Sequence, residues 1–254
     1  MKKIEAIGMY NTNAGFEKYT KAIESIKLWK SEKIIVEKYI SKRSKILDLG
    51  CGAGRTTFGL YDLGYTNIIG LDLSERLTKY AIDYSCRNNY KIKFIEGDSC
   101  SLPFGDNTFD FIIYSFNGLQ LIPGEKNRLN VLKESYRTLK NKGYFIFTAH
   151  NRDEKEFEDY WLQEKNKWLS CKQDKRLEIF GDMIINENGG LGFIHYSSID
   201  ELKAMIQKVG FKIIDIVKRS EIAIEDKNVQ EFSSDTYFWI LRKSEENEIS
   251  KKPC

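Results

Sequence analysis

The sequence feature that most limits the possible folds is the stretch K-I-L-D-L-G-C-G-A-G-R, which covers residues 45–55. Its apolar run is interrupted by Asp48 and ends in glycines at the alternate positions Gly50, Gly52 and Gly54. Glycine is favoured where φ is positive or where a ligand approaches the backbone closely, and a buried carboxylate needs hydrogen-bond partners. The stretch therefore predicts a buried strand, a tight turn and the start of a helix, arranged to hold a small cofactor.

The composition is typical of a globular protein with one substantial core. The chain has 254 residues, 41% of them hydrophobic, and its 40 basic and 37 acidic residues leave a formal net charge of +3. This near balance argues against a dedicated nucleic-acid binder, which usually carries a stronger basic excess. The five cysteines form no C-x-x-C pair, which favours a reducing compartment and predicts no metal site.

Two kinds of segment that would change this picture are missing from the sequence. No apolar run approaches the ~18 residues that a membrane span needs. The start Met1-Lys2-Lys3 is basic like a signal peptide, but no apolar stretch follows it. We therefore expect a soluble, cytoplasmic protein.

Strand-like and helix-like patterns alternate from residue 31 to residue 150. This rhythm predicts right-handed βαβ units and an open parallel sheet. Ligands of such sheets bind at the carboxyl ends of the strands. The segments expected at that edge are 50–54, Asp72, Asp98, 114–117 and 150–152.

The boundaries of the expected elements follow from caps, apolar periodicity and glycine stops. Ser31 is expected to cap a helix over 32–40, and Ser74 to cap another. Apolar residues at 129, 132, 136 and 139 predict a further helix, ended by Gly143; other helices are expected over 55–63 and 199–209. The expected strands cover residues 46–49, 67–73, 91–96, 109–116, 144–149, 211–217 and 236–242.

The alternation stops between residues 151 and 197. A charged, aromatic, helix-like stretch is followed by apolar runs at 183–185 and 193–196, which flank turn residues and predict a hairpin. This insertion is in a position to cover the pocket. The expected organisation is therefore a helical N-terminal lid (1–44), a cofactor-binding core (45–150), a lid or substrate insertion (151–197), the C-terminal part of the core (198–243) and a flexible tail (244–254).

The glycine spacing distinguishes between two kinds of cofactor site. A nicotinamide dinucleotide site needs G-x-G-x-x-G, whereas here the third glycine falls one place early and Arg55 stands in its position. The pattern is D-x-G-x-G-x-G instead, and Asp72 follows Asp48 by 24 positions (72 − 48).

With these residues the chain resembles the class I S-adenosylmethionine-dependent methyltransferases, over about residues 31–150. Further motifs of the resemblance are Gly97-Asp98-Ser99 with Leu102-Pro103-Phe104, Phe109-Asp110, and 136–143 (Y-R-T-L-K-N-K-G).

The resemblance implies a doubly wound α/β fold with a mostly parallel seven-stranded sheet. This is the Rossmann-like methyltransferase fold, here with an antiparallel last strand and a small helix and hairpin lid, as in stand-alone bacterial members of the family. It also implies that the chain is a methyltransferase with S-adenosylmethionine as its cofactor.

The residues expected to bind the cofactor lie at successive strand ends. Asp72 is expected to accept hydrogen bonds from both ribose hydroxyls. Asp98 and the Ser99 backbone N–H are expected to bind adenine, and Leu73 to pack on its face. Asp48 would orient the ammonium group of the methionine portion, directly or through water. The remaining candidates are Gly50, Cys51, Gly52, Gly54 and Tyr114.

The methyl acceptor is less clearly specified by the sequence. Nucleic-acid amino methyltransferases of this fold carry N/D-P-P-Y/F after the fourth strand, but residues 114–118 read Y-S-F-N-G, and no Pro-Cys dipeptide is present there for cytosine C5 chemistry. We therefore expect a small-molecule acceptor, methylated on oxygen or nitrogen, with nucleic acid disfavoured. A structured tRNA or rRNA acceptor, and a non-catalytic module that binds S-adenosylmethionine, stay open. No pattern indicates an oligomeric state.

Three residues near the expected active edge are candidates for catalysis. His150 ends the fifth expected strand, and His195 with Tyr196 lies in the insertion. They are expected to act as a base or to orient the acceptor, although each histidine could equally bond a nearby backbone carbonyl. Tyr10, Tyr19 and Trp29 are placed to close the pocket from the N-terminal side, or else belong to the core.

Overall fold

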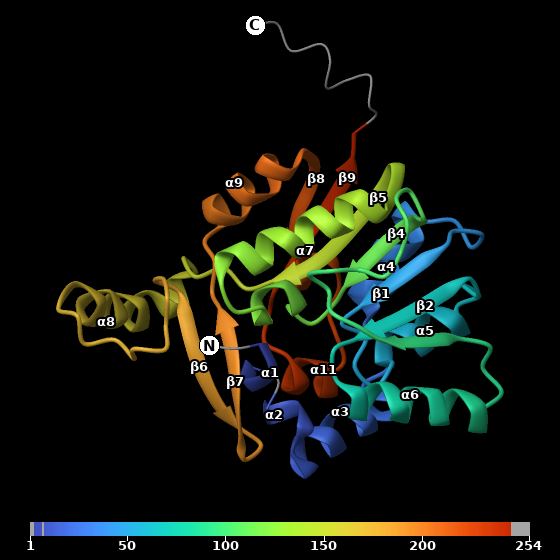
Figure 1. The fold of residues 1–254 in the computed structure, drawn as a ribbon, viewed down its shortest axis with the longest axis horizontal. Helices are drawn as coiled ribbons and strands as arrows, with labels where there is room; N and C mark the ends of the chain where they lie inside the picture. Colours follow the sequence, from blue (N-terminus) through green and yellow to red (C-terminus); the bar gives the residue numbers. More distant parts are fainter. Residues whose placement is uncertain (1–2, 7, 245–254) are drawn as a thin grey trace, which may run out of the picture.

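A seven-stranded sheet forms the centre of the computed structural model, which describes residues 3–6 and 8–244 (Figure 1). The strand order is β3-β2-β1-β4-β5-β9-β8. The first five strands in this order pair in parallel, and β9 runs antiparallel to both of its neighbours. This confirms the doubly wound fold with an antiparallel last strand. The strands are β1 (Ile46–Leu49), β2 (Ile68–Asp72), β3 (Lys93–Glu96), β4 (Phe109–Tyr114), β5 (Leu139–Ala149), β8 (Phe211–Lys218) and β9 (Tyr237–Lys243).

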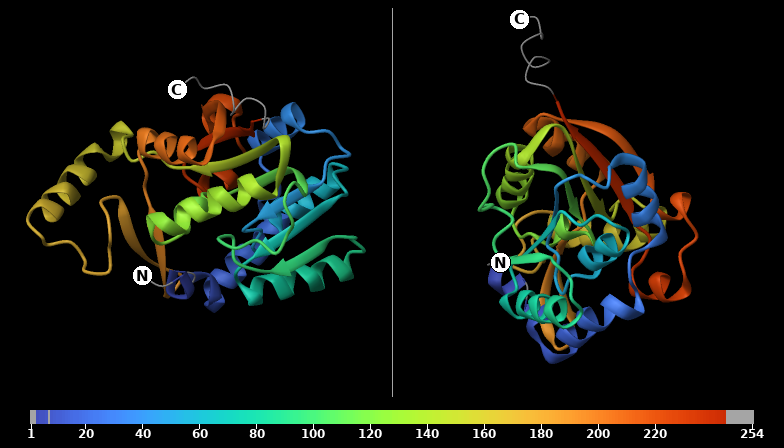
Figure 2. Two further views of the ribbon diagram at one scale, coloured as in Figure 1. Left: turned by 45° about the horizontal axis from the view of Figure 1, so that its top comes forward. Right: turned by 90° about the vertical axis from the view of Figure 1, so that its right-hand side faces the viewer.

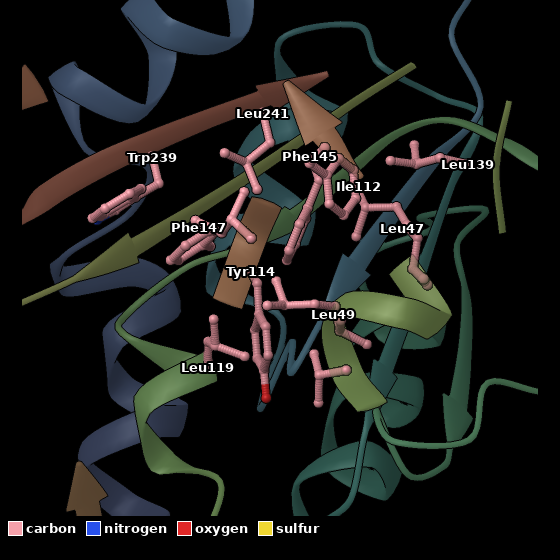
Figure 3. Close-up of a cluster of buried hydrophobic side chains, with 14 of the residues drawn as sticks. Leu47, Leu49, Ile112, Tyr114, Leu119, Leu139, Phe145, Phe147, Trp239 and Leu241 are labelled. Carbon is pink, nitrogen blue, oxygen red and sulfur yellow. The ribbon is translucent and has the colours of Figure 1, made fainter. Parts of the chain in front are cut away.

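Helices cover both faces of this sheet. One face carries α7 (Glu125–Thr138) and α9 (Ile199–Val209), whose apolar residues pack with those of β4, β5 and β9. Figure 3 shows strand residues of this cluster, among them Ile112, Phe145 and Trp239. The other face carries α4 (Lys30–Tyr39) and α5 (Arg55–Asp62). Strands buried on both faces need apolar residues at nearly every position, which explains the almost uninterrupted apolar run of β4. The other helices are α1 (Lys3–Ala6), α2 (Gly8–Asn11), α3 (Asn13–Ser25), α6 (Glu75–Arg87), α10 (Arg219–Ile222), α11 (Lys227–Phe232) and the 3₁₀ helix η1 (Gly118–Leu121).

Most of the predicted boundaries are confirmed within a few residues. Ser74 is the N-cap of α6, and its hydroxyl accepts the Leu77 N–H. Gly210 ends α9 with a φ of +100°. None of the described helices combines the length and the apolar character that crossing a membrane requires. Beyond Ser244, the expected flexible tail lies outside the described residues, as do Met1 and Lys2.

Two of the boundary predictions are wrong. Ser31 lies inside α4, because the helix starts at Lys30 and the free N–H of Trp29 is satisfied by the Glu32 carboxylate. Gly143 does not end α7, which stops at Thr138. Leu139 already belongs to β5, where it pairs with Phe109 of β4.

The predicted hairpin between residues 151 and 197 is confirmed as β6 (Asp182–Glu187) paired with β7 (Gly190–His195). The hairpin packs closely on α2 at Gly190 and Met9. A Cβ added to Gly190 would lie only 2.7 Å from the Cα of Met9, so only glycine fits there. Lys18 of α3 also bonds Glu187 at the end of β6, at 2.7 Å. The preceding elements are η2 (Lys155–Phe157) and α8 (Glu158–Leu169), and α8 projects away from the rest of the molecule (Figures 1 and 2).

A buried ion pair joins the N-terminal helices to the glycine turn. The Arg55 guanidinium donates two hydrogen bonds of 2.7 Å to the Glu32 carboxylate, and Glu32 is fully buried. Arg55 also donates to the Lys27 carbonyl at 2.7 Å and lies 4.9 Å from the centre of the Trp29 ring. A bidentate pair with further hydrogen bonds is the geometry in which a buried charge can be tolerated.

Removing one partner of this pair should destabilise the fold strongly. We expect Arg55→Met to lower the free energy of unfolding by about 3–5 kcal/mol, because it leaves the Glu32 carboxylate buried and uncompensated. Adding Glu32→Gln should recover much of this loss, since the neutral amide oxygen can still accept the Trp29 N–H. Urea unfolding of both variants measures the two effects. A double variant no more stable than Arg55→Met would contradict this account.

Asp48 is a second buried ionisable group beneath the turn. It points from β1 toward the α5 face and is 1% exposed, and its carboxylate accepts the Thr57 hydroxyl. Burial raises the pKa of Asp48 to about 7, although the hydrogen bond from Thr57 and the nearby Arg55 act to lower it. The folded chain therefore holds a proton on Asp48 at pH values where the unfolded chain has lost it.

This proton predicts a definite dependence of stability on pH. Between about pH 4 and pH 7 the folded state binds more protons than the unfolded state, so stability falls as the pH rises, by up to about 1.4 kcal/mol per pH unit. We expect Asp48→Asn to remove this contribution and to be more stable than the unmodified chain at pH 7. Urea unfolding of both proteins at pH 5, 6 and 7 gives the difference. Parallel curves for the two proteins would refute the raised pKa.

Candidate active site

A cavity lies at the carboxyl ends of β1, β2 and β4, where the parallel sheet was expected to bind its ligand. It encloses about 1030 Å³ of space, part of which opens to solvent. Seven of the predicted cofactor residues line it together: Gly50, Cys51, Gly52, Asp72, Leu73, Ser99 and Tyr114. Most of the residues that the sequence predicts to bind the cofactor therefore lie around one cavity.

The glycine turn shapes one wall of this cavity. Gly50 has a φ of +65°, and a Cβ there would lie only 2.4 Å from Cε2 of Tyr114, so a side chain would displace that ring. Gly52 has a φ of +54°, and a Cβ there would meet nothing closer than Leu77, at 3.9 Å. The turn thus lets the Tyr114 ring pack against it and leaves backbone open to the cavity.

Asp72 fastens this turn to the end of β2. One carboxylate oxygen accepts the Gly52 N–H at 2.7 Å and the other accepts the Ser74 N–H at 2.8 Å. Each carboxylate oxygen can accept a second hydrogen bond, so both oxygens can still receive a donor from a ligand in the cavity. Burial raises the pKa of Asp72, and the hydrogen bonds from the backbone oppose this. The residue suits a pair of neighbouring ligand hydroxyls, as the ribose of S-adenosylmethionine presents.

Three cofactor candidates lie outside the lining of the cavity. Asp48 is behind the turn, bonded to Thr57. Gly54 is the left-handed N-cap of α5. The Asp98 carboxylate accepts the Cys100 N–H at 2.8 Å, while its neighbour Ser99 reaches the cavity. A role for these three in binding the cofactor stays a prediction.

Aromatic residues from distant parts of the chain complete the cavity. Tyr10 and Tyr19 line it from α2 and α3, on the N-terminal side. Burial raises the pKa of both, so their hydroxyls stay protonated and can donate hydrogen bonds. Two further aromatic residues of the lining, Phe116 and Phe232, were not among the predicted site residues. Phe116 lies in a segment expected at the active edge, whereas no pattern had indicated α11, which carries Phe232.

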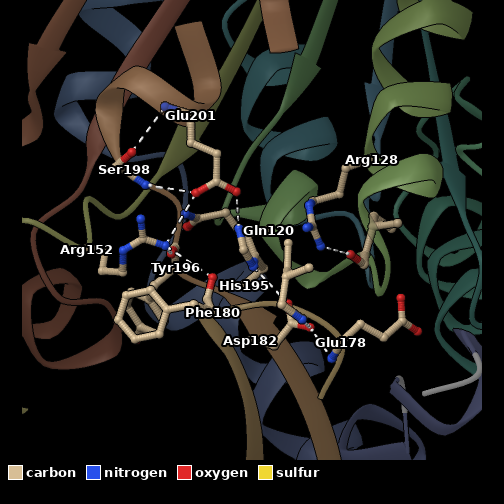
Figure 4. Close-up of polar contacts among 12 residues, drawn as sticks. Gln120, Arg128, Arg152, Glu178, Phe180, Asp182, His195, Tyr196, Ser198 and Glu201 are labelled. Carbon is tan, nitrogen blue, oxygen red and sulfur yellow. Dashed lines mark hydrogen bonds and ion pairs between the residues drawn. The ribbon is translucent and has the colours of Figure 1, made fainter. Parts of the chain in front are cut away.

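His195 occupies a buried site at the base of the hairpin (Figure 4). It is fully buried, and its two ring nitrogens lie 2.8 Å from the Asp182 carboxylate and 2.6 Å from the Glu201 carboxylate. The imidazole lowers the pKa of both carboxyl groups through hydrogen bonds, against the effect of burial. Arg152 donates to the carbonyls of Phe180 and Tyr196 in the same cluster. His195 thus connects the hairpin to the start of α9.

His150 and Tyr196 lie side by side near this cluster. Their rings stack with centres 5.3 Å apart. The His150 ring bonds the Asn117 side chain at 2.8 Å and the Asp235 carbonyl at 3.2 Å. Neither residue, nor His195, lines the cavity. A catalytic role for the three stays a prediction, and their contacts here hold loops and the insertion in place.

Comparison with known proteins agrees with this architecture. Residues 46–143 match the family model for a methyltransferase domain. A demethylmenaquinone methyltransferase of Staphylococcus carnosus is 28% identical over 215 residues, which are 81% of this chain and 84% of that protein. A putative methyltransferase of Bacillus subtilis is 22% identical, over 70% of this chain and 77% of its own length.

Solved structures show the same fold. A SAM-dependent methyltransferase from Methanosarcina mazei has a TM-score of 0.68 at 21% identity, over 87% of this chain and all of its own. A protein from Pyrococcus horikoshii has a TM-score of 0.62 at 22% identity, over 96% of this chain and all of its own. The family match spans the strands that build the cavity, and together with this fold it supports the assignment of residues 46–143 as a methyltransferase domain that uses S-adenosylmethionine.

Proposed function

We propose that the chain transfers the methyl group of S-adenosylmethionine to an oxygen or nitrogen atom of a small-molecule acceptor. The observation that carries this proposal is the cover over the cavity. Tyr10, Tyr19 and Phe232 belong to helices outside the sheet, and they line the same cavity as the glycine turn. A cavity covered in this way suits a small molecule better than a polynucleotide. The similarity to a demethylmenaquinone methyltransferase, whose name denotes a small-molecule acceptor, supports the proposal.

Residues of the turn and of the two following strand ends would hold the cofactor. Asp72 would accept the ribose hydroxyls, and the backbone at Gly50 and Gly52 would lie along the methionine portion. Leu73 and Ser99 would contact the adenine. When bound, the cofactor would supply a methyl group attached to a sulfonium sulfur. A lone pair of the acceptor would form the new bond to the methyl carbon, while the electrons of the broken carbon–sulfur bond stay on sulfur.

The chain itself would contribute mainly position and shelter from water. Holding two reactants in line can supply roughly 7–11 kcal/mol of the barrier. The charged residues that line the cavity are Arg55 and Asp72, and both already have partners within the protein. No histidine, lysine or glutamate lies among the described residues that line it. The acceptor would therefore present its own reactive lone pair, with tyrosine hydroxyls as hydrogen-bond donors beside it.

The N-terminal helices take the role of the lid in this proposal. α2 and α3 supply Tyr10 and Tyr19, whereas no residue of 151–197 lines the cavity. The hairpin of the insertion packs on α2 and bonds to α3 through Lys18 and Glu187. The insertion would thus support the lid from outside and influence the acceptor only through it.

The binding of the cofactor tests the premise of this proposal. We expect Asp72→Ala to weaken S-adenosylmethionine binding about 10- to 150-fold, the effect of losing 1.5–3 kcal/mol of hydrogen bonding to a charged group. Isothermal titration calorimetry measures this effect. Asp83→Ala, which removes an exposed carboxylate from α6, is the matched control and should bind normally. No binding to the unmodified chain at millimolar cofactor would refute the proposal.

The class of acceptor requires a separate measurement. We expect the release of S-adenosylhomocysteine when the chain and the cofactor are mixed with a pooled library of small metabolites, and none with bulk tRNA or rRNA. Release with RNA, together with binding that weakens steeply as salt is raised, would favour an RNA acceptor. Tight cofactor binding without release from either pool would indicate a non-catalytic binding module.

A further inference from the structure

Four aromatic rings meet at one part of the cavity. Tyr10 and Tyr19 have ring centres 5.0 Å apart, Tyr19 and Phe116 6.0 Å, and Phe116 and Phe232 5.1 Å. All four line the cavity and stay partly exposed, unlike Trp29, which is fully buried beside Phe116. These separations are the usual ones for interacting rings. The faces and edges left uncovered are therefore available to a ligand.

Phe116 reaches this position through an unusual backbone conformation. Its φ is +54° and that of Asn117 is +59°, so two consecutive residues other than glycine are left-handed. Such a conformation is a genuine outlier for a bulky residue and costs free energy. Glycine would make the same turn without this cost. The phenyl ring at position 116 is therefore a feature that the turn itself does not require.

Asn117 holds the turn in this conformation. Its backbone N–H donates to the Thr148 hydroxyl, its side-chain oxygen accepts the Thr236 hydroxyl, and its side-chain nitrogen bonds the His150 ring, all at 2.8 Å. Asn117 is 5% exposed, so these bonds lie in the protein interior. The strained turn is thus fixed to β5, to the residue that follows β5 and to the residue that precedes β9.

His150 completes this arrangement. Its Nδ1 lies 3.2 Å from the Asp235 carbonyl, which can only accept, so Nδ1 carries the proton and Nε2 accepts from the Asn117 amide. Burial lowers the pKa of His150, which keeps this neutral form. His150 therefore acts on the cavity through Asn117.

The reactive lone pair that the proposed function requires limits the chemistry of the acceptor. Without a histidine, lysine or glutamate in the described lining to take up a proton, an acceptor hydroxyl has to release its own proton readily to solvent. A hydroxyl on an aromatic ring does so far more readily than an aliphatic hydroxyl. The flat face of such a ring also matches the exposed rings of Phe116 and Phe232.

We infer that this aromatic part of the cavity binds the flat ring of an aromatic hydroxyl compound and that Phe116 selects for it. Asn117 and His150 are positioning residues that keep Phe116 in place. The inference rests on the proposed methyl transfer to a small molecule. It adds the chemical class of the acceptor and the residues that determine specificity.

A matched pair of probes tests the selection. 2-Naphthol and trans-decahydro-2-naphthol share one carbon skeleton and one hydroxyl, but only the first is flat and aromatic. Calorimetry is carried out on the full chain saturated with S-adenosylhomocysteine. We expect 2-naphthol to bind about three- to tenfold more tightly, as ring–ring contacts add to the burial of apolar surface. Equal affinity, tighter binding of the saturated alcohol, or no binding of either probe at millimolar concentration would overturn the inference.

Variants assign the selection to Phe116. Phe116→Leu should bring the two affinities to within about twofold of each other. Asn117→Gly, which tolerates a positive φ but loses both side-chain hydrogen bonds, should also reduce the preference. Phe104→Leu makes the first substitution at a ring that packs on Phe109 outside the cavity and should keep the preference. The ratio of two affinities measured on one protein does not change merely because less of it is folded.

The outcomes separate this inference from the function on which it rests. A preference that Phe116→Leu leaves unchanged would overturn the role of Phe116. A chain that binds S-adenosylhomocysteine but shows no aromatic preference would contradict only the inference. A chain that does not bind S-adenosylhomocysteine would contradict the proposed function and the inference together.

Discussion

The buried pair between Glu32 and Arg55 is the contact on which the cavity most depends. Arg55 begins the helix that follows the glycine turn, and Glu32 lies in the first turn of α4. The pair therefore fixes the N-terminal segment against the glycine turn, which forms one wall of the cavity. The Glu32 carboxylate also accepts the Trp29 N–H at the start of α4. One carboxylate therefore both caps this helix and compensates the buried Arg55 guanidinium. Arg55, which stands where the motif of a dinucleotide site has its third glycine, thus also holds the N-terminal segment in place.

Buried and half-buried polar groups occur at several places in the molecule where segments distant in sequence meet. Asp72 joins the turn after β1 to the turn after β2. Asn117 joins the turn after β4 to β5 and to the segment just before β9, and His195 joins the hairpin to α9. Each group has at least two protein partners, as buried polar groups require. Apolar packing builds the sheet and its helices, and these polar contacts fix the loops at its active edge.

Local patterns were enough to predict the sheet and most of the residues that line the cavity at the ends of β1 and β2. The apolar runs of β1 and β4 and the cap at Ser74 depend on neighbours in sequence. Gly143 misled the prediction, because exposed polar residues precede it and hide the start of β5, which long-range pairing of Leu139 with Phe109 determines. Ser31 misled it because the cap of α4 comes from Glu32, a residue held in place by a partner 23 positions away.

The acceptor side of the site could not be predicted for a related reason. The left-handed backbone of Phe116 and Asn117 depends on hydroxyls from Thr148 and Thr236, which no local pattern connects to the turn. Phe232 lies on a helix of six residues, too short to show apolar periodicity. The carboxylate opposite His195 was in principle detectable, since pairing the predicted hairpin brings Asp182 directly across from it.

The packing of the hairpin on α2 has a consequence for the speed of turnover. The cavity is covered by two successive layers, the N-terminal helices and then the hairpin, in contact where Met9 meets Gly190 and Gly192. Because the hairpin packs on α2, motion of the helices that cover the cavity also involves the hairpin, and in many enzymes such opening rather than chemistry limits the rate. Changes within 151–197 would then alter how long a product stays bound while leaving its recognition intact. In evolutionary terms, residence time and selectivity could be tuned separately, on different segments of one chain.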